Sequence, residues 1–178
     1  MKSKTICGTR KLVLLALMAS IAIMLSILEN LFPIPVPVPG IKPGLANVIS
    51  LTAIIIWGFG EAVLIMLIRT MATAFAAGSL FMFSFSLAGG LLSICVMYFF
   101  HRKLSGVFNI AGVSIAGSIM HNIGQLAVAA LVMKEAAVFS YLPVLMISGV
   151  LMGILTGIST QMILRVIGRT VNIPERRN

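Results

Sequence analysis

The sequence contains no aspartate and has few charged residues of any kind. Among its 178 residues four are glutamate, 10% are charged and 60% are hydrophobic, with a mean hydropathy of +1.13. Soluble domains average about 45–50% apolar and about 25% charged residues. The composition therefore excludes a water-soluble globular protein. The two cysteines, Cys7 and Cys95, show no CxxC or Cys/His spacing, so neither a disulfide framework nor a metal site is expected.

Positive charge is more abundant, and its position along the chain matters more than its amount. A net charge of +9 from thirteen Lys and Arg would suit nucleic acid if the cations clustered on one surface. Instead, most of them flank the apolar runs: Lys2, Lys4, Arg10, Lys11, Arg102, Lys103, Arg165, Arg169, Arg176 and Arg177. Basic residues in these places mark the ends of membrane spans, and no nucleic-acid partner is expected.

Six apolar segments are long enough, or nearly so, to cross a bilayer, which takes roughly 20 residues of helix. A loop with five prolines and two glycines at 32–44 cannot be helical and separates the first two segments. We predict an all-α bundle forming one membrane domain at 12–167, between a basic tail at 1–11 and another at 168–178. The predicted spans are 12–31, 45–59, 62–77, 80–100, 110–133 and 138–167.

The distribution of Lys and Arg also predicts the orientation. With the amino terminus inside, ten of the thirteen basic residues are cytoplasmic, as the positive-inside rule requires. An even number of spans returns the carboxyl terminus to the same side. The chain is therefore expected to be a multi-pass protein of the bacterial cell membrane, surrounded by lipid, with both termini in the cytoplasm.

Polar residues inside the predicted spans are candidates for a site, because ionisable groups in hydrocarbon are costly. Arg69 lies in the middle of the third span. His121, Asn122 and Gln125 lie in the fifth, where His121 and Gln125 are four apart and share a helical face. These side chains either hold a ligand or join helices by hydrogen bonds, and one histidine without partner ligands gives no metal site.

Further candidates lie where the first span meets the proline-rich loop. Glu29 and Asn30 close that span, and Glu29 could meet a cationic ligand group, pair with Lys42 or end the helix in solvent. Lys42 and Asn47 offer polar contacts at the mouth of the bundle. The expected substrate-binding residues are thus Glu29, Asn30, Lys42, Asn47, Arg69, His121, Asn122 and Gln125.

Small residues recur at helical spacing in the last span. Gly149, Gly153 and Gly157 form a doubled GxxxG pattern, which lets two backbones approach closely. This ridge serves either packing within the bundle or a partner subunit, and internal packing is the better-supported interpretation.

Several ordered segments resemble the Gx transporter family, also named heptaprenyl diphosphate synthase component I. The likeness covers about 12–164 and rests on Leu28-Glu29-Asn30, Pro39 to Asn47, Arg69, Leu87-Ala88-Gly89-Gly90, His121 to Gln125 and Tyr141-Leu142-Pro143. It implies a six-helix fold similar to the substrate-binding S-components of energy-coupling factor (ECF) transporters. In that group, a small vitamin-like ligand is captured from outside, and a separate coupling protein with two ATPases drives uptake.

The sequence fits such a division of labour, because it has no GxxxxGK[ST] phosphate loop to hydrolyse ATP itself. By the same resemblance, small residues of the first helix dock the coupling protein, and Ala16 and Ser20 are the weak match here. Relatives are associated with flavin-linked and quinone-linked systems. Flavin-, quinone- and isoprenoid-related ligands therefore all stay open.

The synthase name can be tested against chemistry. Prenyl synthases hold diphosphates through magnesium bound by aspartate-rich motifs, and this chain has no aspartate. We expect no catalytic residue, no cofactor and no enzymatic activity. The first expected function is a substrate-binding subunit for a small anionic or vitamin-like molecule. The alternative is a non-catalytic accessory subunit of polyprenyl diphosphate or quinone synthesis, or of flavin-based electron transfer.

Overall fold

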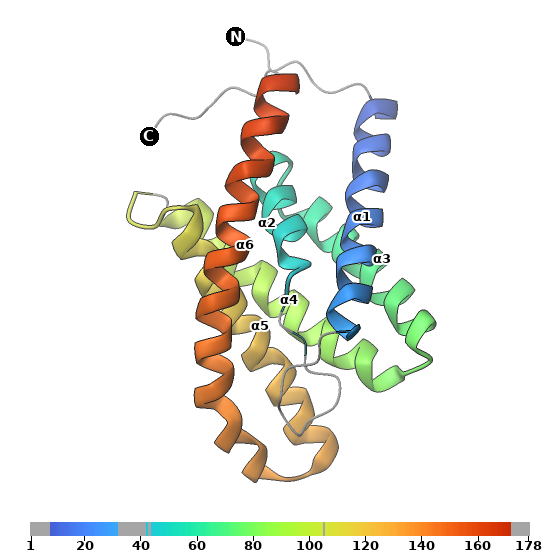
Figure 1. The fold of residues 1–178 in the computed structure, drawn as a ribbon, viewed down its shortest axis with the longest axis vertical. Coiled ribbons are helices and arrows are strands. Elements are labelled where there is room, and N and C mark those ends of the chain that lie inside the picture. Colours follow the sequence, from blue (N-terminus) through green and yellow to red (C-terminus); the bar gives the residue numbers. More distant parts are fainter. Residues whose placement is uncertain (1–7, 32–41, 43, 105, 172–178) are drawn as a thin grey trace.

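The computed structural model describes residues 8–31, 42, 44–104 and 106–171, and within them the fold is entirely helical (Figure 1). The first predicted span forms one helix of 24 residues, which ends at Leu31 as the sequence predicted. The elements are α1 (Gly8–Leu31), α2 (Asn47–Ile56), α3 (Phe59–Ala77), α4 (Leu80–Lys103), α5 (Ile110–Met133), the 3-10 helix η1 (Ala136–Tyr141) and α6 (Leu142–Val171).

Within the described ranges, five helices are long and apolar enough to cross a membrane: α1, α3, α4, α5 and α6. The second predicted span is shorter than expected. Its helix α2 has 10 residues, which at about 1.5 Å per residue is roughly 15 Å, half the thickness of a bilayer core. The fold is thus a bundle of five long helices around one short helix.

The short helix α2 is the most enclosed element of the bundle. Eight of its ten residues are buried, from Asn47 to Ile54. It contacts each of the other five α-helices, and in Figure 1 it lies between α1 and α6. Because most of α2 is enclosed by the other helices, it does not need the length of a helix that spans a bilayer.

The segment that leads into α2 has non-helical backbone inside the bundle. Such backbone is tolerated at membrane depth only where protein or water satisfies its polar groups. Here side chains do so: the Lys42 N–H donates to Gln125 Oε1 at 2.9 Å, and the Leu45 N–H donates to Glu29 Oε1. The polar residues of the predicted site therefore also explain why the second helix begins late.

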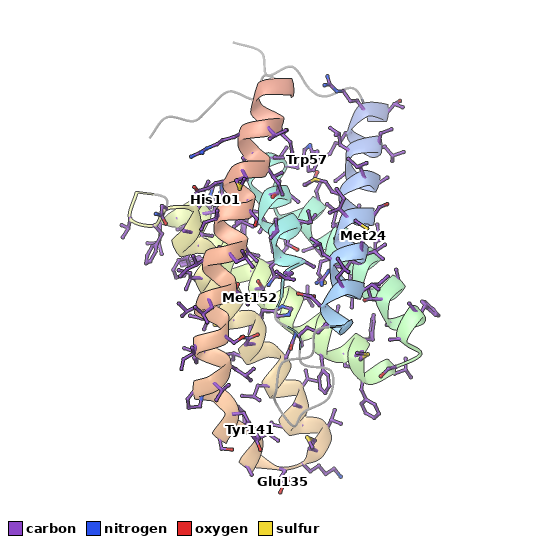
Figure 2. The ribbon with its side chains drawn as sticks, viewed as in Figure 1. Met24, Trp57, His101, Glu135, Tyr141 and Met152 are labelled. Carbon is purple, nitrogen blue, oxygen red and sulfur yellow. The ribbon has the colours of Figure 1, made fainter. Side chains whose placement is uncertain are left out.

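The two ends of the bundle differ in charge. Figure 1 shows the first turn of α1 and the last turn of α6 at the same end, which we call the basic end. Arg10 and Lys11 lie in the first turn of α1, and Arg102 and Lys103 in the last turn of α4. Trp57 and His101 lie toward this end, whereas Glu135 and Tyr141 lie at the opposite end (Figure 2).

The last predicted span is divided in the structure. Residues 136–141 form the 3-10 helix η1, and α6 then runs for 30 residues from Leu142. Pro143 lies in the first turn of α6, where a missing N–H breaks no helical hydrogen bond. Pro143 therefore marks the start of the helix.

The glycines of α6 pack against α5. A Cβ atom built on Gly153 would lie 2.5 Å from Cα of Ile115, and one on Gly157 would lie 2.8 Å from Cα of Ala111. A Cβ atom on Gly149 would lie 3.3 Å from Cα of Ile119. The doubled GxxxG pattern thus brings two helices of the same chain into backbone contact, as internal packing requires. We call this contact the glycine seam.

Candidate functional site

Six of the predicted site residues lie together in the interior, contributed by four helices and the segment before α2. None exposes more than 5% of its surface, although all six carry an ionisable, amide or imidazole group. We call this set the polar cluster, which consists of Glu29 (α1), Lys42, Asn47 (α2), Arg69 (α3), His121 and Gln125 (α5).

Gln125, on α5, connects two other members of the cluster through its side-chain amide. Its Nε2 lies 2.6 Å from Nε2 of His121, one helical turn earlier. Its Oε1 accepts the hydrogen bond from the backbone N–H of Lys42. One amide side chain thus fixes both the imidazole ring and the segment before α2, because its donor and acceptor are used in opposite directions.

Gly44 allows that segment to approach α5. Its φ of +89° is a conformation that side chains other than hydrogen rarely permit. A Cβ atom here would also lie 2.9 Å from Nδ2 of Asn47 and 3.3 Å from Cδ2 of His121. Glycine is therefore needed at this position for two independent reasons.

Arg69 reaches the cluster from α3 and is held on one side only. Its Nη1 donates to Oγ of Ser26 on α1 at 2.8 Å. Its Nε and Nη2 are fully buried and have no hydrogen-bond partner among the described residues. These two atoms form one edge of the guanidinium, the geometry that binds carboxylate or phosphate through two parallel hydrogen bonds.

Two glycines of α4 make room for these side chains. A Cβ atom on Gly90 would lie 2.9 Å from Cγ of Met66 and 3.6 Å from Nη2 of Arg69. A Cβ atom on Gly89 would lie 2.8 Å from the backbone oxygen of His121 and 2.9 Å from Cγ of Gln125. The Gly89-Gly90 pair thus lets α4 pack closely on α5 beside the arginine.

The cluster holds two basic side chains, Lys42 and Arg69, and one acidic side chain, Glu29. When all three are ionised the cluster carries one net positive charge. Burial lowers the pKa of Lys42 from its ordinary value of 10.5; the charge of Glu29 opposes this effect, and the charge of Arg69 adds to it. A buried site with excess positive charge and free donors favours an anionic group.

Asn122 is not part of this cluster. Its Nδ2 donates to the backbone oxygen of Leu145 on α6 at 2.7 Å, so its side chain lies between α5 and α6. Its position follows from the helical period, since it is offset from the face that His121 and Gln125 share. For Asn122, the structure thus supports the helix-joining role that the sequence left open.

Two other predicted residues lie apart from the cluster. Ala16 and Ser20, the predicted partner contacts, are exposed on α1, and the Ser20 hydroxyl donates to the backbone oxygen of Ala16 at 2.9 Å. Whether they bind a partner stays a prediction. The side chain of Asn30 lies outside the described residues, as does most of the proline-rich loop.

Ser26 is a cluster contact that the sequence analysis missed. It is fully buried and accepts from Arg69. Its spacing of three residues from Glu29 on α1 places both on one helical face, a signal that could have identified it. Across the described ranges, no group of three or more His, Cys, Asp or Glu could hold a metal ion, and Cys95 is a free thiol.

These features define a polytopic helical membrane protein with a buried polar cluster that contains two basic residues and one acidic residue. The chain belongs to the heptaprenyl diphosphate synthase component I family, whose model matches residues 18–163. This match confirms the family resemblance under its synthase name. No curated protein and no solved structure shows a significant match, so the likeness to ECF S-components stays a prediction.

Proposed function

We propose that this chain is the substrate-binding membrane subunit of an uptake transporter, and that the polar cluster holds the anionic group of a small molecule. The observation that carries the proposal is the guanidinium edge of Arg69, whose Nε and Nη2 have no hydrogen-bond partner among the residues that the structure describes. A buried arginine with only one of its nitrogens hydrogen-bonded to protein is costly in a membrane interior. A ligand carboxylate or phosphate would offset that cost through two charge-assisted hydrogen bonds.

The other members of the cluster have complementary roles in this proposal. Lys42 adds a second positive charge, and Glu29 keeps one oxygen, Oε2, without a partner among the described residues. Asn47 is buried with both amide atoms unpartnered within the same part of the chain. The cluster therefore offers donors for an anionic group and acceptors for a neighbouring hydroxyl or amine of the same molecule.

Energy for uptake would come from partner proteins. The chain carries no GxxxxGK[ST] phosphate loop, so a coupling protein with ATPases of the ECF type would drive transport. In this arrangement the protein lies in the bacterial cell membrane with its basic end in the cytoplasm. Fusing a reporter to the last residue tests the orientation, since an external reporter signal would contradict it.

The family match favours a second candidate function. Its description names one component of a heptaprenyl diphosphate synthase, which points to a non-catalytic accessory subunit that binds a synthase partner in the membrane. In that case the free edge of Arg69 would hold the diphosphate of an isoprenoid or the headgroup of a lipid. Both candidates use the same anion-binding chemistry and differ in the partner.

The experiment is purification in mild detergent, followed by mass spectrometry of bound small molecules and of co-purifying proteins. The proposal predicts a retained anionic compound in the wild type and its loss in Arg69→Gln, which keeps length but removes charge. Arg102→Gln is the matched control, because Arg102 is an exposed arginine at the end of α4. A wild-type protein that retains no compound but retains a prenyl synthase would favour the second candidate and contradict the first.

A further inference from the structure

A row of polar residues on α5 continues from the polar cluster toward the basic end. Ser114, Ser118, His121 and Gln125 follow one another at intervals of four, three and four residues, so they share one face of the helix. All four are buried. The row extends from Ser114 to Gln125, a rise of about 16 Å along the helix, and it faces the interior from Gln125 to the second turn of α5.

Two hydroxyls in this region differ from most others in the bundle. Buried hydroxyls in membrane helices usually bond to the backbone of their own helix, as Thr52 does with Val48 at 2.7 Å and Thr73 with Arg69 at 2.9 Å. Ser93 on α4 and Ser118 on α5 are at most 1% exposed. Neither of their Oγ atoms has a partner within the described ranges.

These hydroxyls lie along the interface between α4 and α5. A Cβ atom built on Gly117 would lie 3.2 Å from Oγ of Ser93 and 2.6 Å from Sδ of Met97, so both side chains of α4 abut α5 at Gly117, the residue before Ser118. Nearer the basic end, Oγ of Ser114 lies 2.5 Å from Oγ1 of Thr156 on α6. From the cluster toward the basic end, the hydroxyls without a described partner thus come first and the Ser114–Thr156 pair follows.

We infer that ordered water molecules bind along this row, bonded to Ser93 and Ser118, and extend the polar cluster toward the basic end. Buried polar atoms in native proteins find a partner, and water supplies it where protein does not. A buried water makes about two to four hydrogen bonds, enough for one water to bond to a hydroxyl from α4 and another from α5. The bundle thereby acquires a hydrated internal path from the cluster to the second turn of α5.

X-ray radiolysis of the wild-type protein, with residue-level mass spectrometry, tests this inference without any ligand. Radiolysis generates hydroxyl radicals from bound water, and the methionine beside that water is oxidised. Met97 is 1% exposed and Met18 on α1 is 6% exposed, so accessibility alone predicts faster oxidation of Met18. Bound water predicts the reverse, with Met97 oxidised about tenfold faster. Equal rates, or a faster Met18, would overturn the inference.

A variant makes the test specific to the row. Ser118→Ala removes one water ligand, and the oxidation rate of Met97 relative to Met18 should fall at least threefold. Ser20→Ala is the control, because that hydroxyl is bonded to its own helix, and it should leave the ratio unchanged. An unchanged ratio in Ser118→Ala would contradict bound water at this position. Because the readout needs no bound anion, its failure would leave the proposed function standing.

Discussion

The two faces of α5 show opposite ways of using a helix inside a membrane protein. One face carries Ser114, Ser118, His121 and Gln125, which build the polar cluster and the row beside it. The other face contacts the glycines of α6 at Ala111 and Ile115. The α5 residues of the polar cluster lie on the first face, and the backbone contacts with the glycines of α6 lie on the second.

The difference indicates where each kind of stability comes from. Apolar burial gives little between helices that are already in lipid, so close packing and hydrogen bonds must hold the bundle. The glycine seam supplies backbone packing on one face of α5, so the other face can carry polar groups. A substitution in the seam should therefore leave the polar cluster unchanged, and a substitution in the cluster should leave the seam unchanged.

The largest effect is expected at the glycine seam. Gly153→Leu places a side chain where a Cβ atom alone would lie 2.5 Å from the backbone of Ile115, and backbone cannot move aside as a flexible side chain can. We expect a loss of about 3 kcal/mol or more, since overpacking of this kind forces elements apart. Thermal unfolding in detergent measures it.

Gly168→Leu is the control for that variant, because nothing lies within 4 Å of a Cβ atom built on Gly168, also in α6. Its melting temperature should stay close to that of the wild type. A similar fall in both variants would mean that leucine harms α6 generally, and the seam would lose its assigned role.

A smaller effect is expected on the polar face. Gln125→Leu keeps the volume but leaves the Lys42 N–H and the ring of His121 without their hydrogen-bond partner. Unpartnered buried groups cost about 1–3 kcal/mol, so we expect a loss of about 2 kcal/mol in unfolding free energy. Gln161→Leu on α6, where the side chain is only half-buried, should change stability little; equal losses would argue against the cluster as a structural unit.

A comparison of Gly44 with Gly58 separates the cost of backbone strain from the cost of steric crowding. Gly44→Ala combines a φ of +89° with a Cβ atom 2.9 Å from Asn47, whereas Gly58→Ala has a φ of +122° and no atom within 4 Å. Strain at such positions costs about 1–3 kcal/mol, so both variants should lose stability and Gly44→Ala should lose more. Equal melting temperatures for the two variants would show that contact with the cluster adds nothing.

The smallest effect is expected at the basic end, outside both faces of α5. Nζ of Lys11 lies 2.5 Å from Oε1 of Glu61, and the two side chains are 38% and 25% exposed. Pairs this exposed contribute about 0–1 kcal/mol. A double-mutant cycle with Lys11→Ala and Glu61→Ala should give a coupling energy in that range, and a coupling above about 2 kcal/mol would show that this contact rivals the two faces of α5.

Sequence reasoning predicted the helices well and the cluster in part. Hydropathy indicates every long helix, because a segment in contact with lipid must be apolar and must satisfy its own backbone hydrogen bonds. The same rule mispredicted α2, which avoids lipid and is shortened by side chains that satisfy the backbone before Asn47. Arg69 and His121 could be identified as candidates from the sequence, because an ionisable side chain within a membrane span is energetically costly and therefore rare.

What could not be predicted is which polar side chains face one another. Asn122 has the same composition signal as Gln125 but bonds to α6, and only its offset around the helix separates the two. Ser26 shares a helical face with Glu29, but that spacing does not reveal that its hydroxyl accepts from Arg69. Such pairings depend on helix rotation and tilt, which packing decides.

The most direct test of the central claim is the retention of a small molecule by purified wild-type protein and by Arg69→Gln at equal folded concentration. Native mass spectrometry from detergent micelles reads both the mass of the protein and any bound compound. The anion-binding role of the polar cluster predicts an added mass on the wild type that disappears in the variant, with Arg102→Gln behaving as wild type. An added mass that survives in Arg69→Gln would contradict it.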